Sequence, residues 1–274
     1  MERPLVSICI PAYNSARFIT KTIESALNQT YPSIEVVVVD DNSSDDTVAV
    51  VEAIKDDRVK LYRNETNLGM TGNWNKCIRM ARGEYVKLIP ADDIIYPECI
   101  ITSMKIFESN PEVVLSIVAS DLINNDDEIV GKYMHWPKGG VFEGRKVAKK
   151  SAMLNNYFGN PVSVLFKKSD FEKTGGFDED IPYILDFDLW LGLSAFGKVY
   201  FCKEKLSAFR VRNDSNTGVL IGKKSKDYTA EHIRLLDKHI AKNSFSMNRF
   251  ERRVSIIWRS MRNFLISIYI KIKA

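Results

Sequence analysis

The chain has 274 residues, 45% of them hydrophobic and 27% charged, and its formal net charge is +4. This composition is that of an ordinary globular protein with an ample core, and the length fits one large α/β domain with an appendage, or two small domains. Acidic residues dominate the candidate site regions, whereas basic residues crowd the last fifth of the chain. Because nucleic-acid-binding proteins gather basic residues at the functional face, we expect no nucleic-acid partner.

Cysteine usage and the chain ends bear on the compartment. The four cysteines have neither metal-ligand spacing nor a CxxC pair, so we expect buried free thiols in a reducing compartment. A strand that begins near Leu5 leaves no room for a signal peptide. The uncharged apolar stretch 263–270 is too short to cross a bilayer, which takes roughly 20 residues. The expected location is cytoplasmic.

The first 110 residues alternate between short apolar runs and segments with helical periodicity. Apolar runs bounded by turn signals predict buried strands, and their alternation with helices predicts a mostly parallel sheet. The predicted strands are 5–10, 34–39, 59–62 and 85–89, and the predicted helices are 16–28, one after Ser43 or Ser44, 74–81 and 97–108.

The pattern changes after residue 110. We predict a strand at 113–120 with a hairpin partner at 129–133, then strands at 162–166, 199–201 and 206–211, and a helix between Asp186 and Gly197. We therefore expect a single α/β domain over residues 1–215, with a nucleotide-binding half (1–110) and an acceptor half (111–215). Residues 216–274 are expected to form a helical extension.

Two pairs of carboxylates follow predicted strands. The first pair is Asp40 and Asp41, and the second is Asp92 and Asp93. Ligands of open α/β sheets bind at the carboxyl ends of the strands, so these side chains can touch a small molecule. Strand alternation would aim Asp40 and Asp41 in opposite directions, and the more frequent role for Asp40 is capping the polar turn that follows.

Seven segments in this order resemble glycosyltransferase family 2, whose members are inverting enzymes with the GT-A fold, a Rossmann-like α/β architecture. The resemblance covers about residues 4–212. The segments are SICIPAYN (7–14), VVVVDDNSSDDT (36–47), NLG (67–69), ARGEYV (81–86), PADD (90–93), GGFDE (175–179) and LDFDLW (185–190). Each segment is weak alone, but chance agreement of all seven is improbable.

The resemblance assigns roles to the first two acidic pairs and to the loop after the first strand. It implies that Asp41 accepts a hydrogen bond from the nucleotide base, with Pro11 and Tyr13 beside base and ribose. Tyr13 is as plausible as a core aromatic. Matching positions make Asp93 the direct ligand of Mg²⁺ or Mn²⁺ and place Asp92 at ribose or a metal-bound water. The alternative for this pair is capping of the next helix.

The resemblance also places the chemistry on a third acidic cluster. Inversion needs a carboxylate that takes the proton from the acceptor hydroxyl, and the matching residue is Asp186. Asp188 could support the helix start, and helix capping alone would explain one of the two. Many relatives carry a histidine after this cluster, but residues 209–213 read FRVRN. Arg210 or Arg212 could contact the diphosphate instead, or lie exposed on the surface, and strict metal dependence is open.

The C-terminal tail lies outside the resemblance and is amphipathic. Its apolar stripe is Ile257, Met261, Phe264, Leu265, Ile268 and Ile272, and basic residues lie largely off the stripe at Arg252, Arg259, Arg262, Lys271 and Lys273. A basic amphipathic helix is typical of membrane-surface binding, and packing on protein is the alternative. His135, His232 and His239 show no ligand spacing and are interpreted as structural or solvent-facing.

The expected function is inverting transfer of a hexosyl or N-acetylhexosaminyl group from a nucleotide sugar, with UDP-sugars favoured. The expected acceptor is a glycan or a lipid-linked acceptor in bacterial surface polysaccharide synthesis, such as O-antigen or capsule, peripheral to the inner face of the plasma membrane. A catalytically silent sugar-nucleotide-binding or scaffold protein is the alternative. A nucleotidyltransferase is disfavoured because PAYNSARF (11–18) is no glycine-rich phosphate loop.

Overall fold

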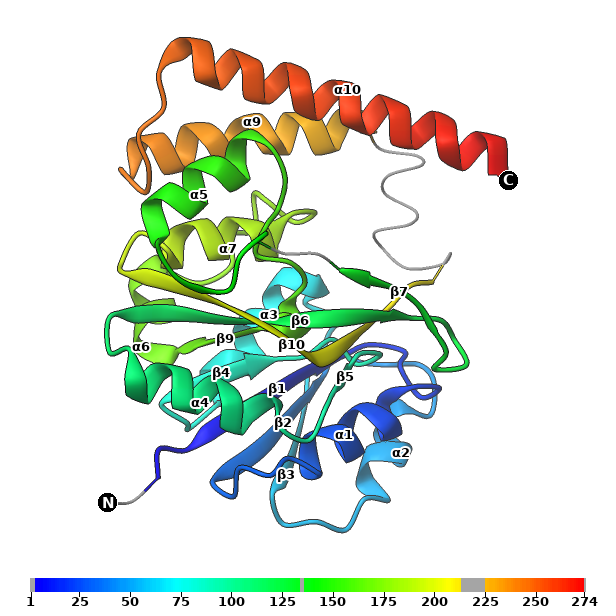
Figure 1. Cartoon of the computed structure of the whole chain (residues 1–274). Coiled ribbons are helices and arrows are strands. Elements are labelled where there is room, and N and C mark those ends of the chain that lie inside the picture. The colour runs from blue at the N-terminus through cyan, green and yellow to red at the C-terminus, as the bar shows by residue number, and fades with distance from the viewer. Residues whose placement is uncertain (1–2, 134–135, 213–224, 274) are drawn as a thin grey trace.

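Figure 1 shows the computed structural model of the chain, which describes residues 3–133, 136–212 and 225–273. One ten-stranded sheet runs through the molecule in the order β3-β2-β1-β4-β9-β6-β10-β5, with β7 paired to β6 and β8 paired to β10. The strands are β1 (Val6–Ala12), β2 (Ile34–Asp40), β3 (Val59–Arg63), β4 (Tyr85–Leu88), β5 (Ile94–Ile95), β6 (Val113–Ile123), β7 (Ile129–Tyr133), β8 (Gly140–Glu143), β9 (Val164–Lys167) and β10 (Lys198–Arg210).

The sheet is mixed, and its two halves differ. Strands β3, β2, β1 and β4 pair in parallel throughout. Strand β9 is antiparallel to both of its neighbours, β4 and β6, and joins the first half to the second. Strands β6 and β10 again pair in parallel. The expected α/β fold with a central sheet flanked by helices is confirmed, and the predicted parallel pairing holds for β1 to β4. This parallel half brings the carboxyl ends of β1, β2 and β4 to one edge.

Helices cover both faces of the sheet. One core contains residues of α3, α5, α6, α7 and α9, and the other contains residues of α1, α2 and α4. The helices are α1 (Ile19–Leu27), α2 (Thr47–Glu52), α3 (Gly69–Met80), α4 (Cys99–Ser109), α5 (Gly144–Met153), α6 (Lys168–Thr174), α7 (Leu185–Leu193), α9 (Ser225–Ala241) and α10 (Arg249–Lys273). Figure 1 shows α9 and α10 side by side as an outer layer beyond α5 and α7.

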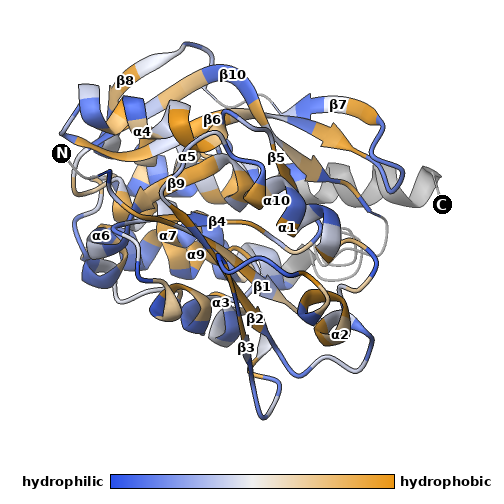
Figure 2. Cartoon of the chain, turned by 90° about the horizontal axis from the view of Figure 1, so that it is seen from below, coloured by the Kyte–Doolittle hydropathy of each residue, from blue (hydrophilic) through white to orange (hydrophobic). Residues whose placement is uncertain are grey.

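Strand β2 is buried on both faces of the sheet. All seven of its residues are buried, and alternate side chains enter opposite cores: Val37 and Val39 on one face, Val36 and Val38 on the other. A strand buried on both faces is typically apolar. The apolar run of β2 is interrupted by Glu35, whose buried carboxylate accepts hydrogen bonds from Ser7 Oγ (2.6 Å) and from Arg82. The hydrophobic colours on β1 and β2 in Figure 2, with hydrophilic colours on the surrounding loops, follow the same pattern.

Most predicted elements are present, with instructive differences in the second half. The hairpin of β6 with β7 is confirmed. The predicted strands 199–201 and 206–211 are one continuous strand, β10, because register shifts against β6 absorb the polar residues between them. The predicted strand 162–166 begins as a 3₁₀ turn (Pro161–Ser163) before β9. No described helix is long and apolar enough to cross a membrane.

Candidate functional site

A cavity of about 530 Å³ opens where the carboxyl ends of β1, β2 and β4 face the start of α7. It brings together residues from most of the predicted site segments. Those predicted residues are Pro11, Tyr13, Asp41, Asp92, Asp186, Arg210 and Arg212. Asp93 is not among the lining residues. The cavity is therefore walled by the strand ends on one side and by the first turn of α7 on the other.

The side chains of Asp40 and Asp41 point to different places, as strand alternation predicts. Asp40 accepts hydrogen bonds from the backbone N–H and hydroxyl of Ser43, at 3.0 and 2.5 Å, and so holds the polar turn. Asp41 lines the cavity, and its Oδ1 accepts bonds from Asn64 Nδ2 (2.6 Å) and from the N–H of Leu68 (2.8 Å). Its Oδ2 accepts no hydrogen bond from the described residues and remains available to a ligand.

The loop after β1 supplies an exposed aromatic side chain. Tyr13 is 53% exposed and lines the cavity with Pro11, the penultimate residue of β1. The alternative that Tyr13 is a core aromatic is thereby wrong. Asn14 follows with φ of +47°, and its side-chain oxygen accepts the N–H of Ser44 at 2.9 Å. This bond ties the loop to the turn after β2 and fixes the position of Tyr13.

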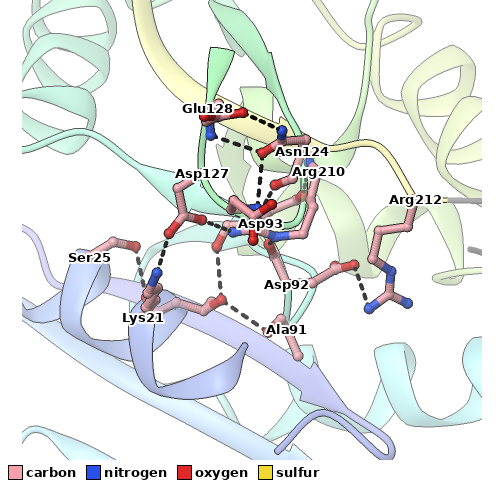
Figure 3. Close-up of polar contacts among 12 residues, drawn as sticks. Lys21, Ser25, Ala91, Asp92, Asp93, Asn124, Asp127, Glu128, Arg210 and Arg212 are labelled. Carbon is pink, nitrogen blue, oxygen red and sulfur yellow. Dashed lines mark hydrogen bonds and ion pairs between the residues drawn. The ribbon is translucent and has the colours of Figure 1, made fainter. Parts of the chain in front are cut away.

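Asp92 and Asp93 differ in how deeply their side chains are buried. Asp92 lines the cavity and lies 3.5 Å from Nη1 of Arg212. Asp93 is fully buried, and its Oδ1 accepts the backbone N–H of Arg210 at 2.8 Å. Burial, and then the charge of Asp92, raises the pKa of Asp93 well above its usual range. Figure 3 shows Asp92 extending toward Arg212, with Asp93 enclosed beside Arg210. Of the two, Asp92 presents its carboxylate to the cavity.

The two arginines after β10 also differ. The guanidinium of Arg210 is fully buried, and it donates to the carbonyl oxygens of Asp92 (2.8 Å) and Asn124 and to the carboxylate of Asp127 (2.5 Å). Its Nε, Nη1 and Nη2 atoms each donate to a protein group, and the diphosphate contact suggested for Arg210 stays a prediction. Arg212 keeps 25% of its side chain exposed beside Asp92, and it is the more accessible candidate for that contact.

Asp186 lies in the first turn of α7 and lines the cavity. Burial raises the pKa of its carboxyl group to about 6, and its Oδ1 accepts the N–H of Phe187 at 2.8 Å. Asp186 thus satisfies one N–H of the first turn of α7, but it does not hold the residues that precede the helix. That role falls to Glu231 of α9, whose carboxylate accepts the N–H groups of Tyr183 (3.1 Å) and Ile184 (3.2 Å). Asp186 is thereby left to face the cavity.

Asp188 points away from the cavity and links α7 to the C-terminal extension. Its carboxylate binds Lys238 Nζ at 2.6 Å and His239 Nε2 at 2.9 Å, and both Asp188 and His239 are buried. The interpretation of His232 and His239 as structural is confirmed, since Ser255 and Ser244 also hold their ring nitrogens. His135 lies outside the described residues.

The sequence reasoning missed several residues at the site. Asn73 and Trp74 of α3 line the cavity; Asn73 lies in the Asp41 network and Trp74 packs edge-on to Phe177, with ring centres 5.4 Å apart. Trp74 recurs at helical spacing with the apolar residues of α3, so the sequence indicated only a core role for it. Glu231 carried no signal in the sequence, because its partners lie 47 and 48 residues away.

The residues that line the cavity offer few ligands for a divalent cation such as Mg²⁺ or Mn²⁺. Asp92 offers one carboxylate, and the described residues contain no group of three or more His, Cys, Asp or Glu side chains that could hold a metal ion. Mg²⁺ and Mn²⁺ retain several waters and bind substrate phosphates with one or two protein carboxylates. Asp92 therefore fits such a cation if a diphosphate supplies further oxygens. Asp93 does not line the cavity, but its buried Oδ2 has no hydrogen-bond partner among the described residues, so its role as the metal ligand stays a prediction.

Known proteins resemble this chain in sequence and in fold. The family model described as "Glycosyl transferase family 2" matches residues 7–174. An uncharacterized protein of Mycobacterium tuberculosis is 32% identical over 76% of this chain and 67% of its own length. Chondroitin synthase of Escherichia coli is 28% identical over 87% of this chain, and this chain spans 33% of that protein. For chondroitin synthase of Pasteurella multocida the identity is 30%, and the chain spans 21% of it.

Solved structures agree on the fold. S. aureus TarS (residues 1–349) with UDP-GlcNAc superposes with a TM-score of 0.73 at 16% identity, over 93% of this chain and 71% of that one. Mannosyltransferase PcManGT from Pyrobaculum calidifontis, in complex with GDP-Man and Mn²⁺, superposes with a TM-score of 0.66 at 17% identity. The superposition covers 100% of this chain and 76% of that one. Together with the family match, these similarities show that the chain is a glycosyltransferase with the GT-A fold and belongs to glycosyl transferase family 2.

Proposed function

We propose that the protein transfers a sugar, with inversion, from a UDP-sugar to a glycan or lipid-linked acceptor in bacterial surface polysaccharide synthesis. One observation carries the proposal: a single cavity is lined by Asp41, Asp92 and Asp186, which come from two strand ends and a facing helix start. The catalytically silent alternative predicts that one of these groups is missing or buried away from the cavity.

The donor is proposed to bind against the strand ends. Oδ2 of Asp41 would accept an N–H of the base, Tyr13 would cover the base or the ribose, and Arg212 would donate to the diphosphate. Asp92 is the proposed protein ligand of Mg²⁺ or Mn²⁺, in place of Asp93. When bound, the cation would neutralise the charge that develops on the leaving diphosphate.

The chemical step is proposed to occur at Asp186. Its ionised carboxylate takes the proton of the acceptor hydroxyl while that oxygen attacks the anomeric carbon. The bond from this carbon to the diphosphate oxygen breaks, and the nucleoside diphosphate leaves with the electron pair. Attack on the face opposite the leaving group inverts the configuration. The pKa of about 6 keeps Asp186 ionised at neutral pH and basic enough to accept a proton.

The donor assignment is tested by a thermal-shift screen of UDP-, GDP- and dTDP-sugars with Mn²⁺, followed by NMR of the product made with a panel of acceptors. We expect UDP-sugars to give the largest shift and the product to have the opposite anomeric configuration to the donor. A larger shift with GDP- or dTDP-sugars would reject the base assignment. Retention of configuration would reject Asp186 as a base.

The location is proposed to be the inner face of the plasma membrane, through the exposed side of α10. Phe250, Ile257 and Met261 are 74, 66 and 46% exposed and recur on one helical face, and Arg253 lies exposed beside them. The other predicted stripe residues, from Phe264 on, have side chains outside the described part. Apolar groups flanked by cations suit an anionic bilayer surface, and the four unpaired cysteines suit a reducing compartment.

Vesicle flotation tests the membrane proposal. With vesicles that contain an anionic phospholipid, Ile257→Asp is expected to weaken binding about thirtyfold, because burial of one such side chain contributes about 2 kcal/mol. Ile129→Asp is the matched control, since Ile129 is 61% exposed on β7. Equal binding by all three proteins would indicate that α10 packs on protein instead.

A further inference from the structure

A second cavity lies between α6, α7 and the end of α9. Its volume is about 330 Å³, and it shares no lining residue with the cavity that holds Asp186. Helix α7 contributes to both cavities through different residues: Asp186 lines the first, and Asp188, two positions later, lines the second. The proposed transfer makes no use of the second cavity, so its composition needs an explanation of its own.

The walls of the second cavity carry more positive than negative side chains. Its cationic lining residues are Arg145, Lys173, Lys238 and Lys242, and its one lining carboxylate is Asp188. Nζ of Lys238 lies 2.6 Å from Asp188 and 2.7 Å from Asp178, and Nζ of Lys173 lies 2.7 Å from Asp170. No carboxylate of the described residues pairs with the other two cations, Arg145 and Lys242. Two positive charges at one cavity therefore lack a counterion from that part of the chain.

The backbone that carries these two cations is held in place. Three backbone hydrogen bonds of 2.9 to 3.1 Å close residues 242–244 onto the last turn of α9. The ring of His239 pairs with the hydroxyl of Ser244 at 2.9 Å, and both side chains are buried. The guanidinium of Arg145 donates to the carbonyl oxygen of Asn243, which ties α5 to the same turn. Groups that are positioned before a ligand arrives lose less conformational freedom on binding.

An apolar wall lies opposite no charge of its own. Phe196 follows α7, is 47% exposed and lines the cavity together with Leu189 and Ala195. Nζ of Lys173 lies 5.8 Å from the centre of the Phe196 ring. Sites for small molecules combine apolar walls with a few polar groups that fix the orientation of the ligand. The second cavity has both parts, and its polar part is cationic.

We propose that the second cavity binds a small phosphate monoester, with its phosphoryl group at Arg145 and Lys242 and its body against Phe196. A phosphoryl group carries about 1.5 to 2 negative charges at neutral pH and three acceptor oxygens, which match two cations without a counterion. A carboxylate would match only one of them. The inference does not depend on the proposed glycosyl transfer, whose diphosphate contact, Arg212, lies outside this cavity.

Calorimetric titration of the full chain tests the proposal, with glucose 6-phosphate as the probe and potassium chloride setting equal ionic strength. We expect saturable binding of glucose 6-phosphate, weaker binding of inorganic phosphate and none of glucose. Lys242→Gln is expected to weaken the binding of glucose 6-phosphate about tenfold, the cost of one charge-assisted hydrogen bond. Lys146→Gln is the matched control and should bind like the wild type, because Lys146 is exposed on α5 and does not line the cavity.

Several results would overturn the proposal. They are absence of saturable binding of glucose 6-phosphate, an unchanged affinity in Lys242→Gln, or an equal loss in Lys146→Gln, which would indicate unspecific attraction by charge. A loss in Arg212→Gln instead would place the probe in the cavity of Asp186. An affinity for glucose 6-phosphate no higher than that for inorganic phosphate would reject an ester that covers Phe196. If Lys242→Gln does not fold, Arg145→Gln takes its place with the same expected loss.

Discussion

The acidic pair after β2 and the acidic pair in α7 look alike in the sequence but are held in different ways. Asp40 and Asp41 take their partners from nearby residues, none more than 27 positions away. Asp188 takes its partners from α9, 50 and 51 residues away, and Glu231 of the same helix holds the start of α7. The carboxylates at the end of β2 are therefore held by local contacts, whereas the proposed catalytic wall depends on the C-terminal extension.

This difference separates binding from chemistry within the chain. The family match ends at residue 174, before Asp186, and it includes the strand ends with Asp41 and Asp92. Substitutions near β2 and β4 should therefore alter donor binding without altering the stability of α7. Substitutions in α9 should loosen the helix that carries Asp186 and leave the donor wall intact. The predictions below test this separation.

The largest effect is expected for Asp186→Asn. Removal of a general base costs about 10²–10⁴-fold in rate, so transfer should fall about a thousandfold, while UDP binding changes little. Steady-state kinetics with a confirmed acceptor and calorimetric titration with UDP measure the two quantities. Full turnover by this variant would show that another group takes the proton.

Asp188→Asn is expected to lower stability instead of chemistry. Loss of the buried carboxylate leaves Lys238 and His239 without their shared partner, and breaking a buried pair costs about 3 kcal/mol. Urea denaturation measures the loss. Asp237→Asn is the control, because the pair of Asp237 with Arg252 is exposed and is expected to contribute less than about 1 kcal/mol. Equal losses in the two variants would contradict the role of the extension.

The pH dependence of kcat should report the burial of Asp186. The carboxylate is the active form, and burial raises its pKa to about 6, so kcat is expected to fall about tenfold per unit below pH 6. Glu231 also has a pKa raised to about 6 by burial, and it holds the start of α7. Glu231→Gln should therefore retain the midpoint near pH 6. Disappearance of the acid limb in that variant would assign the titration to Glu231.

The sequence predicted what local patterns encode. Apolar runs with turn signals located β1, β2 and β4, and strand alternation separated Asp40 from Asp41. The continuity of β10 was missed because the polar residues between its two apolar runs resemble a loop, and only pairing with β6 keeps them in a strand. The burial of Arg259 and the capping by Glu231 were also inaccessible, because both depend on how α9 and α10 pack on α7.

Asp92 and Asp93 test the proposed donor side of the cavity. The smallest of the predicted effects, a change in Mn²⁺-dependent UDP binding, is expected there. Adjacent residues cannot be told apart by motif, and the resemblance favours Asp93 as the metal ligand, but burial turns only Asp92 to the cavity. Asp92→Asn should weaken Mn²⁺-dependent UDP binding about tenfold, a typical cost for a change at a metal site. Asp93→Asn should keep the Mn²⁺ response, because an amide oxygen can still accept the N–H of Arg210. Calorimetry with and without Mn²⁺ measures both, and a selective loss in Asp93→Asn would return the metal to Asp93.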